Sequence, residues 1–294
     1  MTVSATKIYQ QRRPAAPTLL DTRPDEQLQN DGTLTEPDIK ALRAAQRDSA
    51  DRFREVASRM GLATEQDVRR ALAQQIEFPV FKPGESDLSP ELVAAYQPYC
   101  ERAEELRTLR SELMLRWFGR NNRVLAVIEP RRDNGCSVLA ANLAVAFAQL
   151  GERTLLIDAN LRTPLQHRLF GVEPQRGLVD YIKGGESLQN ALTQVPGIRS
   201  LSLLCAGDRP PNPQELLGHV SFGYLLESAL GAYDVVIVDT PPICECADAQ
   251  LIASLARGAI LAIRRHIARL ADLMRVKAQL ESAGVSLLGA VIDG

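Results

Sequence analysis

The 294-residue sequence predicts an α/β fold, a mostly parallel sheet with helices on both faces, preceded by a small helical module. Two observations support this prediction. From Glu101 to the C-terminus, short apolar segments alternate with segments of helical pattern. Before that point, residues 21–80 carry a tandem repeat with apolar residues at helical spacing. The composition, 45% hydrophobic and 24% charged, is that of a globular protein.

The chain begins with a polar stretch, residues 1–20, in which Pro14 and Pro17 interrupt any helix, so we expect a disordered leader. A repeat with a period of 29 residues follows. It consists of Arg23, Gly32, Thr35, Glu36, Asp38, Ile39 and Gln46, which recur as Arg52, Gly61, Thr64, Glu65, Asp67, Val68 and Gln75. In each copy a threonine precedes an acidic first turn, the usual start of a helix. We therefore predict a helical module over residues 21–98.

The α/β domain is predicted over residues 101–294 and opens with a charged helical segment, ERAEELRTLRSELMLRWF. Six strands are expected after it, at Val124–Ile128, Thr154–Asp158, Leu201–Leu204, Val235–Asp239, Ile260–Arg264 and Leu287–Ile292. They are short and rich in Val, Ile and Leu, as strands buried on both faces of a parallel sheet are.

A loop, EPRRDNG, follows the first strand, and a helix begins after it with an apolar face. Strand, loop and helix in this order are typical of a phosphate-binding loop, in which backbone amides, a lysine and a hydroxyl hold phosphates and magnesium. This loop alone would not identify the fold, but together with the segments LLIDANLR and VVIVDTPP at the right distances after it, the pattern predicts a P-loop NTPase-like fold. The nucleotide-binding candidates in this loop are Asn134, Gly135, Cys136, Ser137 and Val138.

The loop departs from the usual pattern at two positions. Cys136 stands where the lysine is expected, and Pro130 stands where the first glycine is expected. Loss of the charged donor costs about 2 to 5 kcal/mol for a desolvated pair, and a thiol is too weak a donor to replace it. Arg131 or Arg132 is the alternative source of that charge.

Two of the predicted strands end in aspartate, within LLIDANLR and VVIVDTPP. Carboxylates at the C-terminal ends of parallel strands point into the crevice where ligands of such sheets bind. We therefore expect Asp158 and Asp239 to converge on a magnesium nucleotide, with Ser137 and Asp158 as magnesium ligands. The alternative for each aspartate is a cap on the following helix.

Together these segments resemble the bacterial tyrosine kinases of capsule and exopolysaccharide assembly, most closely the EpsG-type chain-length-determinant group. The resemblance is carried by LRTLRSELMLRWF, AANLAVAFAQLGERTLLIDANLR, GLVDYIKGGESL, AGDRPPNPQELL and VVIVDTPP. It implies Asp158, Asp239 and Arg162 as catalytic residues and Mg-ATP or Mg-ADP as cofactor. Asn160 replaces one family carboxylate, and Asp293 stands where the family places an asparagine that contacts adenine.

The resemblance also implies partners. An E-x-x-R-x-x-R motif mediates self-association in relatives, and Glu104, Arg107 and Arg110 match it. The alternative is a ladder of ion pairs on a solvated helix. A membrane-bound, Wzz-like chain-length determinant is the expected partner, which would hold the chain at the cytoplasmic face of the membrane. The net charge of −2 provides no general attraction to nucleic acid.

The N-terminal repeat resembles the N-terminal module of type II secretion and pilus ATPases, which binds cyclic di-GMP in some members. Arg23, Gln46, Arg52 and Gln75 are the candidate ligands here. The glycine of each R-L-G unit is replaced, by Asp25 and Arg54, and a side chain there obstructs close approach of a ligand. A protein-docking module is the alternative.

Three functions follow from the sequence. The favoured one is a degenerate kinase, a pseudokinase that oligomerises and regulates exopolysaccharide chain length or export. The second is an active ATP-dependent protein-tyrosine autokinase, consistent with Asp158 and Asp239. The third is a partition-type positioning ATPase, which shares the fold but lacks the PPNPQELL segment. No apolar run reaches the roughly 20 residues that span a membrane, so we expect a cytoplasmic protein.

Overall fold

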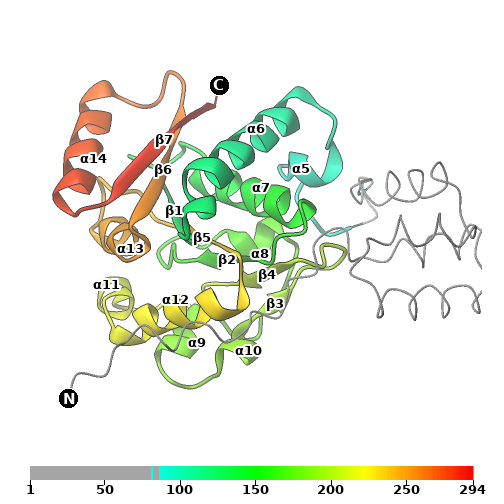
Figure 1. Ribbon diagram of the computed structural model, residues 1–294. Helices are drawn as coiled ribbons and strands as arrows, with labels where there is room; N and C mark the ends of the chain where they lie inside the picture. The colour runs from blue at the N-terminus through cyan, green and yellow to red at the C-terminus, as the bar shows by residue number, and fades with distance from the viewer. Residues whose placement is uncertain (1–80, 82–85, 294) are drawn as a thin grey trace, which may run out of the picture. The chain divides into compact units, whose positions relative to one another are not determined.

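The computed structural model describes residue 81 and residues 86–293 of the chain. The chain divides into two units, Met1–Phe78 and Pro79–Gly294. The second contains a seven-stranded sheet of order β3-β4-β2-β5-β1-β6-β7 (Figure 1). The strands are β1 Val124–Ile128, β2 Thr154–Asp158, β3 Thr193–Gln194, β4 Leu201–Leu204, β5 Val235–Asp239, β6 Gly258–Arg264 and β7 Ser286–Asp293.

All neighbouring strands pair in parallel except β3 and β4, which are antiparallel. The predicted α/β fold is therefore confirmed. The predicted bounds of β1, β2, β4 and β5 match the structure, and β6 and β7 start earlier than predicted, at Gly258 and Ser286. The short strand β3 was not predicted, because its two polar residues carry no strand pattern.

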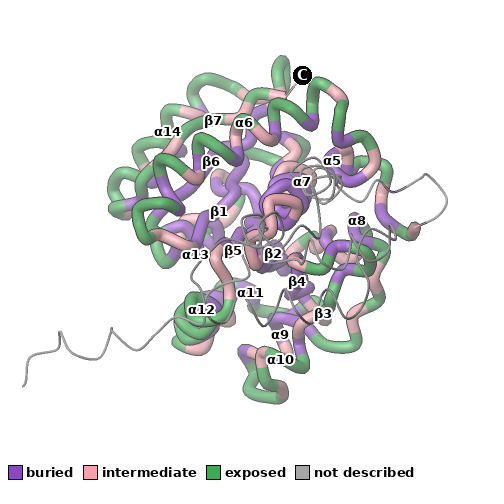
Figure 2. Tube along the Cα trace, turned by 45° about the vertical axis from the view of Figure 1, so that its right-hand side comes forward, coloured by how far each residue is buried: buried purple, intermediate pink, exposed green. Residues whose placement is uncertain are grey.

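The helices are α5 Val93–Tyr96, α6 Glu101–Arg116, α7 Cys136–Gln149, α8 Gln166–Leu169, α9 Leu178–Ile182, α10 Leu188–Ala191, α11 Pro213–Leu217, α12 Val220–Ala232, α13 Asp248–Ala256 and α14 Leu270–Ser282, with a 3-10 turn η2 at Phe118–Arg120. One hydrophobic cluster joins the sheet to α5, α6, α7 and α8. A second joins its other face to α9, α12, α13 and α14. The three central strands are buried throughout (Figure 2).

The helix α6 ends against the edge of β6. The indole N–H of Trp117 donates to the carbonyl of Val124 at 2.9 Å. A Cβ added at Gly258 would lie 2.3 Å from the Trp117 ring, so only glycine allows this close approach. The contact fixes the end of α6 on the sheet.

The segment before α6 packs on α7. The Asn142 side chain accepts from the N–H of Ala94 at 3.0 Å and donates to the carbonyl of Glu91 at 2.9 Å. Gln149 donates to the carbonyl of Ala94 at 2.8 Å. Residues 88–96, predicted as the end of the helical module, thus pack with the sheet. The leader and the repeat lie outside the described residues.

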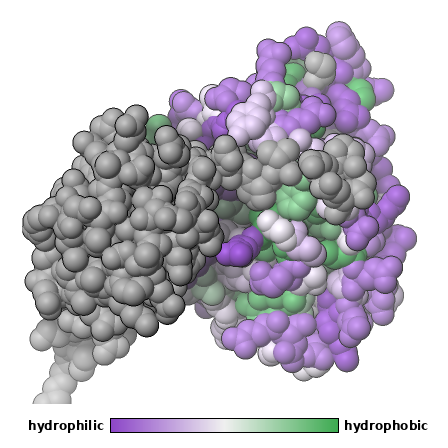
Figure 3. Space-filling model, turned by 90° about the vertical axis from the view of Figure 1, so that its right-hand side faces the viewer, coloured by the Kyte–Doolittle hydropathy of each residue, from purple (hydrophilic) through white to green (hydrophobic). Residues whose placement is uncertain are grey.

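The side of the molecule that carries α5 has a mostly hydrophilic rim, and hydrophobic side chains gather toward its middle (Figure 3). Among the helices that the structure describes, none is long and apolar enough to cross a membrane.

Candidate nucleotide and magnesium site

The phosphate-binding loop connects β1 to α7. Gly135, its last residue before the helix, has a φ of 84°, a left-handed conformation that favours glycine. At the start of the loop lies Glu129, a buried carboxylate. Its Oε2 accepts from the N–H groups of Asn134 at 3.0 Å and Cys136 at 3.5 Å. In phosphate-binding loops such amides bind the phosphates, so here the chain supplies its own anion to them.

Burial raises the pKa of Glu129 to about 7, although hydrogen bonds from Cys136 and Asn134 oppose the shift. The negative charge of Asp239 raises it further. The carboxyl group therefore changes its charge near neutral pH, and its protonated form competes less well for the amides.

The side chain at the lysine position is buried against the ends of β1 and β5. Cys136 is buried, and its Sγ lies 3.1 Å from the carbonyl of Val127 and 3.5 Å from Oδ1 of Asp239. Burial raises the pKa of the thiol, and the charges of Asp239 and Glu129 add to the shift. A neutral thiol packed beneath the loop supplies no charge to a phosphate.

The two arginines of the loop are held in ion pairs. Arg131 makes two hydrogen bonds to Asp272, at 2.7 and 3.0 Å, and Arg132 donates to Glu245 at 3.0 Å. Both partners lie in other parts of the chain. Neither arginine is therefore free to take the place of the lysine without breaking its pair.

The two strand-end aspartates lie side by side. Asp158 and Asp239 are register partners on β2 and β5, and both are fully buried. Between them lies Gln166, which the sequence did not nominate. Its Nε2 donates to Oδ2 of Asp239 at 2.7 Å and to the carbonyl of Ser137 at 3.0 Å. Gln166 follows Asp158 by only eight residues. Its position as a polar residue soon after the strand was the only feature of the sequence that could have indicated this role.

Asp158 also fills the alternative role of a helix cap. Its Oδ2 accepts from the N–H groups of Leu165 at 3.1 Å and Gln166 at 3.0 Å, at the start of α8. Burial raises the pKa of both aspartates, and the charge of Asp239 raises that of Asp158 further. The pair therefore retains a proton at a pH where a solvated pair would be fully ionised.

Magnesium suits this cluster. Two buried oxygens, Oδ1 of Asp158 and Oε1 of Gln166, have no hydrogen-bond partner among the described residues. Ser137 lies beside them, because its carbonyl accepts from Gln166 at 3.0 Å, and its hydroxyl is a further oxygen of this region. Magnesium prefers oxygen ligands and usually binds one or two carboxylates together with substrate phosphates.

The third predicted catalytic residue lies apart from the aspartates. Arg162 makes two hydrogen bonds to the buried Asp248, at 2.8 and 3.1 Å, at the start of α13. It lines a pocket together with Arg209, Pro210, Pro211 and Pro213. The structure therefore does not bring Arg162 into hydrogen-bond contact with Asp158 or Asp239.

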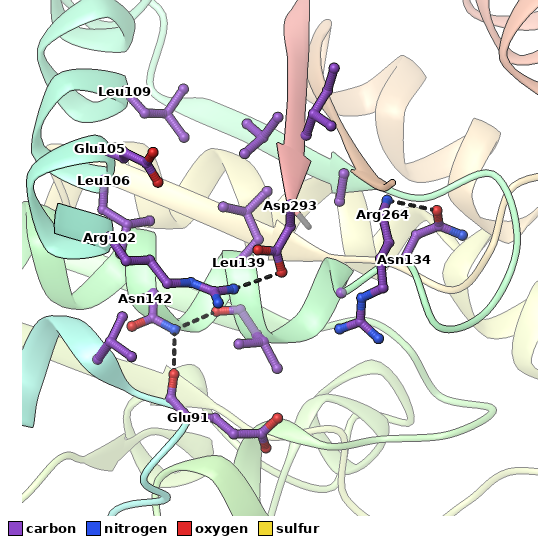
Figure 4. Close-up of a pocket in the computed structure, with 16 residues that line it drawn as sticks. Glu91, Arg102, Glu105, Leu106, Leu109, Asn134, Leu139, Asn142, Arg264 and Asp293 are labelled. Atoms are coloured by element: carbon purple, nitrogen blue, oxygen red, sulfur yellow. Dashed lines mark hydrogen bonds and ion pairs between the residues drawn. The ribbon is translucent and has the colours of Figure 1, made fainter. Parts of the chain in front are cut away.

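The remaining nucleotide candidates line a pocket of about 240 Å³ beside the loop (Figure 4). They are Asn134, Gly135, Val138 and Asp293. Apolar side chains of α6 and α7 form much of the wall, among them Leu106, Leu109 and Leu139. Asp293 forms a 2.7 Å ion pair with Arg102 of α6. An apolar pocket with a few charged groups is typical of a small-molecule site.

One cation of this pocket was missed by the sequence analysis. Arg264 ends β6, and its main-chain N–H donates to Oδ1 of Asn134 at 3.0 Å. Its Nη2 lies 3.8 Å from the position that a Cβ on Gly135 would take. Arg264 reaches the loop because β1 and β6 pair in parallel, and strand order cannot be read from the sequence. The sequence showed only a basic residue at the end of a predicted strand.

Of the three self-association candidates, two pair with each other. Arg107 donates from Nε to Glu104 at 2.9 Å, as in the predicted alternative of a helix ion-pair ladder. Arg110 is buried and donates to the carbonyl of Ala146 on α7 at 2.9 Å. Glu104 is exposed, whereas Arg110 holds α6 to α7.

No family model matches the sequence. The chain is 35% identical over 209 residues to the tyrosine-protein kinase YwqD of Bacillus subtilis, covering 71% of this chain and 88% of that kinase. The chain belongs to the bacterial tyrosine kinases. Another member, the tyrosine-protein kinase etk of Escherichia coli K12, is 33% identical over 202 residues, covering 69% of this chain and 28% of etk.

Solved structures of bacterial tyrosine kinases agree. The kinase domain of Escherichia coli ETK superposes with a TM-score of 0.68 at 31% identity, covering 71% of this chain and 81% of that domain. The chimerical protein CapA2B2 gives a TM-score of 0.65 at 30% identity, covering 78% of this chain and 98% of CapA2B2. MinD from Pyrococcus horikoshii, at 23% identity and a TM-score of 0.51, shares the fold alone. The predicted family and P-loop fold are thus confirmed.

Proposed function

We propose that this bacterial tyrosine kinase is a pseudokinase, an oligomeric regulator of exopolysaccharide chain length or export. The observation that carries the proposal is the state of its phosphate-binding loop. A neutral, buried thiol replaces the lysine, and Glu129 takes the amides that would bind phosphate. Phosphoryl transfer depends almost entirely on positioning and charge stabilisation, so the loss of both weakens it severely.

The regulator acts through protein contacts. The expected partner is a membrane-bound chain-length determinant, which holds the chain at the cytoplasmic face of the membrane. Support comes from the family and from the PPNPQELL segment, part of which forms α11. Self-association through α6 is supported by the exposure of Glu104, which leaves its carboxylate accessible to a second copy.

Cyclic di-GMP binding remains a prediction for the N-terminal repeat. Its candidate ligands, Arg23, Gln46, Arg52 and Gln75, all lie outside the described residues.

An active autokinase is the second candidate. It is favoured by the convergence of Asp158, Asp239 and Gln166 with oxygens suited to magnesium. In that case magnesium, held by Ser137 and Asp158, would neutralise phosphate charge. Asp239 would then orient the attacking tyrosine hydroxyl.

The test is phosphotyrosine formation. We expect the purified full-length chain, incubated with magnesium ATP, to gain no phosphotyrosine by mass spectrometry beyond the level of its Asp239→Asn variant. Glu281→Gln, which changes an exposed carboxylate on α14 that pairs with Lys277, serves as the control. Phosphotyrosine that accumulates in the natural chain and disappears in Asp239→Asn would overturn the pseudokinase proposal in favour of the autokinase.

A further inference from the structure

We propose that Arg264 supplies the cation that the loop lacks, its guanidinium binding the phosphates of a nucleoside diphosphate or triphosphate in the pocket beside Gly135. The inference rests on a pseudokinase that still binds nucleotide, and it assigns that binding to a residue outside the loop. The cation then comes from β6, whereas a lysine would come from the first turn of α7.

The topology directs Arg264 to the loop. Strands β1 and β6 are parallel, with Ile128 opposite Leu261, so both leave the sheet at the same edge. The bond from the Arg264 N–H to the Asn134 side chain fixes this strand end against the loop. The side chain extends from there into the pocket (Figure 4), with Nη2 close to Gly135.

Within the described part of the chain, Arg264 differs from the other cations around the loop because it has no counterion there. Arg131 is paired with Asp272, Arg132 with Glu245, and Arg102 with Asp293. Among the described residues, the Arg264 guanidinium has no ion-pair or hydrogen-bond partner, although it is only partly exposed. A partly buried cation without a counterion favours an anionic ligand.

The pocket indicates which anion fits. Its apolar wall, with Leu106, Leu109 and Val138, suits a nucleobase, and Arg264 lies at the end nearest the loop. A guanidinium donates two parallel hydrogen bonds to a phosphate, which a thiol cannot do. The acidic groups of the pocket, Glu91, Glu105 and Asp293, repel a small free anion such as inorganic phosphate. A nucleotide offsets this repulsion, because its nucleobase also packs on the apolar wall.

Calorimetric titration of magnesium ADP into the full-length chain tests the inference. We expect saturable binding by the natural chain and a Kd about 30-fold or more higher in Arg264→Gln. Arg265→Gln, which changes the exposed neighbouring arginine, is the matched control and should leave the Kd within about threefold. Because the Arg264 side chain makes no bonds within the described structure, its loss should not lower the melting temperature.

A lysine restored at position 136 provides the decisive comparison. In the double variant Cys136→Lys, Arg264→Gln, the lysine should recover the binding that Arg264→Gln loses. Equal Kd values for the natural chain and Arg264→Gln would overturn the inference, as would binding only by chains that carry Cys136→Lys. Phosphotyrosine in the natural chain would defeat the pseudokinase proposal but leave the role of Arg264 intact, so the two failures are distinguishable.

Discussion

At the scale of single residues, the site is defined by buried acids more than by cations. Glu129, Asp158 and Asp239 lie within one loop and two strand ends, and burial raises the pKa of all three. A carboxyl group whose pKa is raised by folding stabilises the protein while protonated. Its contribution is complete below the unfolded-state pKa and is lost as the pH rises through the folded-state pKa.

The free energy of unfolding should therefore fall as the pH rises from about 4.5 to above 7, the window set by Glu129. In Glu129→Gln, the free energy of unfolding should fall less across this pH window, by on the order of 1 to 3 kcal/mol. Urea denaturation at a series of pH values measures it, with Glu281→Gln, an exposed carboxylate on α14, as the control. A slope that is the same in the natural chain and in Glu129→Gln would contradict the assignment.

Some residues of the candidate site could be predicted from the sequence, and others could not. Asp158, Asp239 and the loop were recognisable because strand ends and loop residues are adjacent in sequence to strong patterns. Gln166 and Arg264 were not, because their roles depend on side-chain direction and on strand order. Arg162 was named from a family motif, and in the structure it pairs with Asp248.

At the scale of elements, the hydrophobic pattern determined most of the sheet. Four of its strands have the predicted bounds because their buried runs of Val, Ile and Leu stop abruptly. The bounds of β6 and β7 were less evident. Gly258 belongs to β6 although glycine is rare inside strands, and the reason is its contact with Trp117. Strand patterns do not reveal such a tertiary requirement.

Gly258→Ala should lower the free energy of unfolding by about 1 to 3 kcal/mol, because its new methyl group would overlap the Trp117 ring. The control is Gly231→Ala on α12, where an added Cβ meets nothing within 4 Å and alanine is the better helix former. Chemical denaturation of both variants compares them. Equal stabilities would show that Trp117 shifts at little cost.

At the scale of the whole molecule, the sheet brings together groups from distant parts of the chain. The loop, the two aspartates and Arg264 come from β1, β2, β5 and β6, the four strands whose C-terminal ends form the site. The wall of α6 adds Arg102, whose ion pair with Asp293 connects α6 to the end of β7. The family scaffold is thus retained around a loop that has lost its lysine.

Steady-state hydrolysis of magnesium ATP by the purified full-length chain tests this account most directly. The account predicts phosphate release no faster than that of the Asp239→Asn variant, because no cation of the loop itself faces the phosphates and Glu129 holds its amides. Release that exceeds the Asp239→Asn level and rises with ATP to saturation would contradict it, because the site would then be a working one.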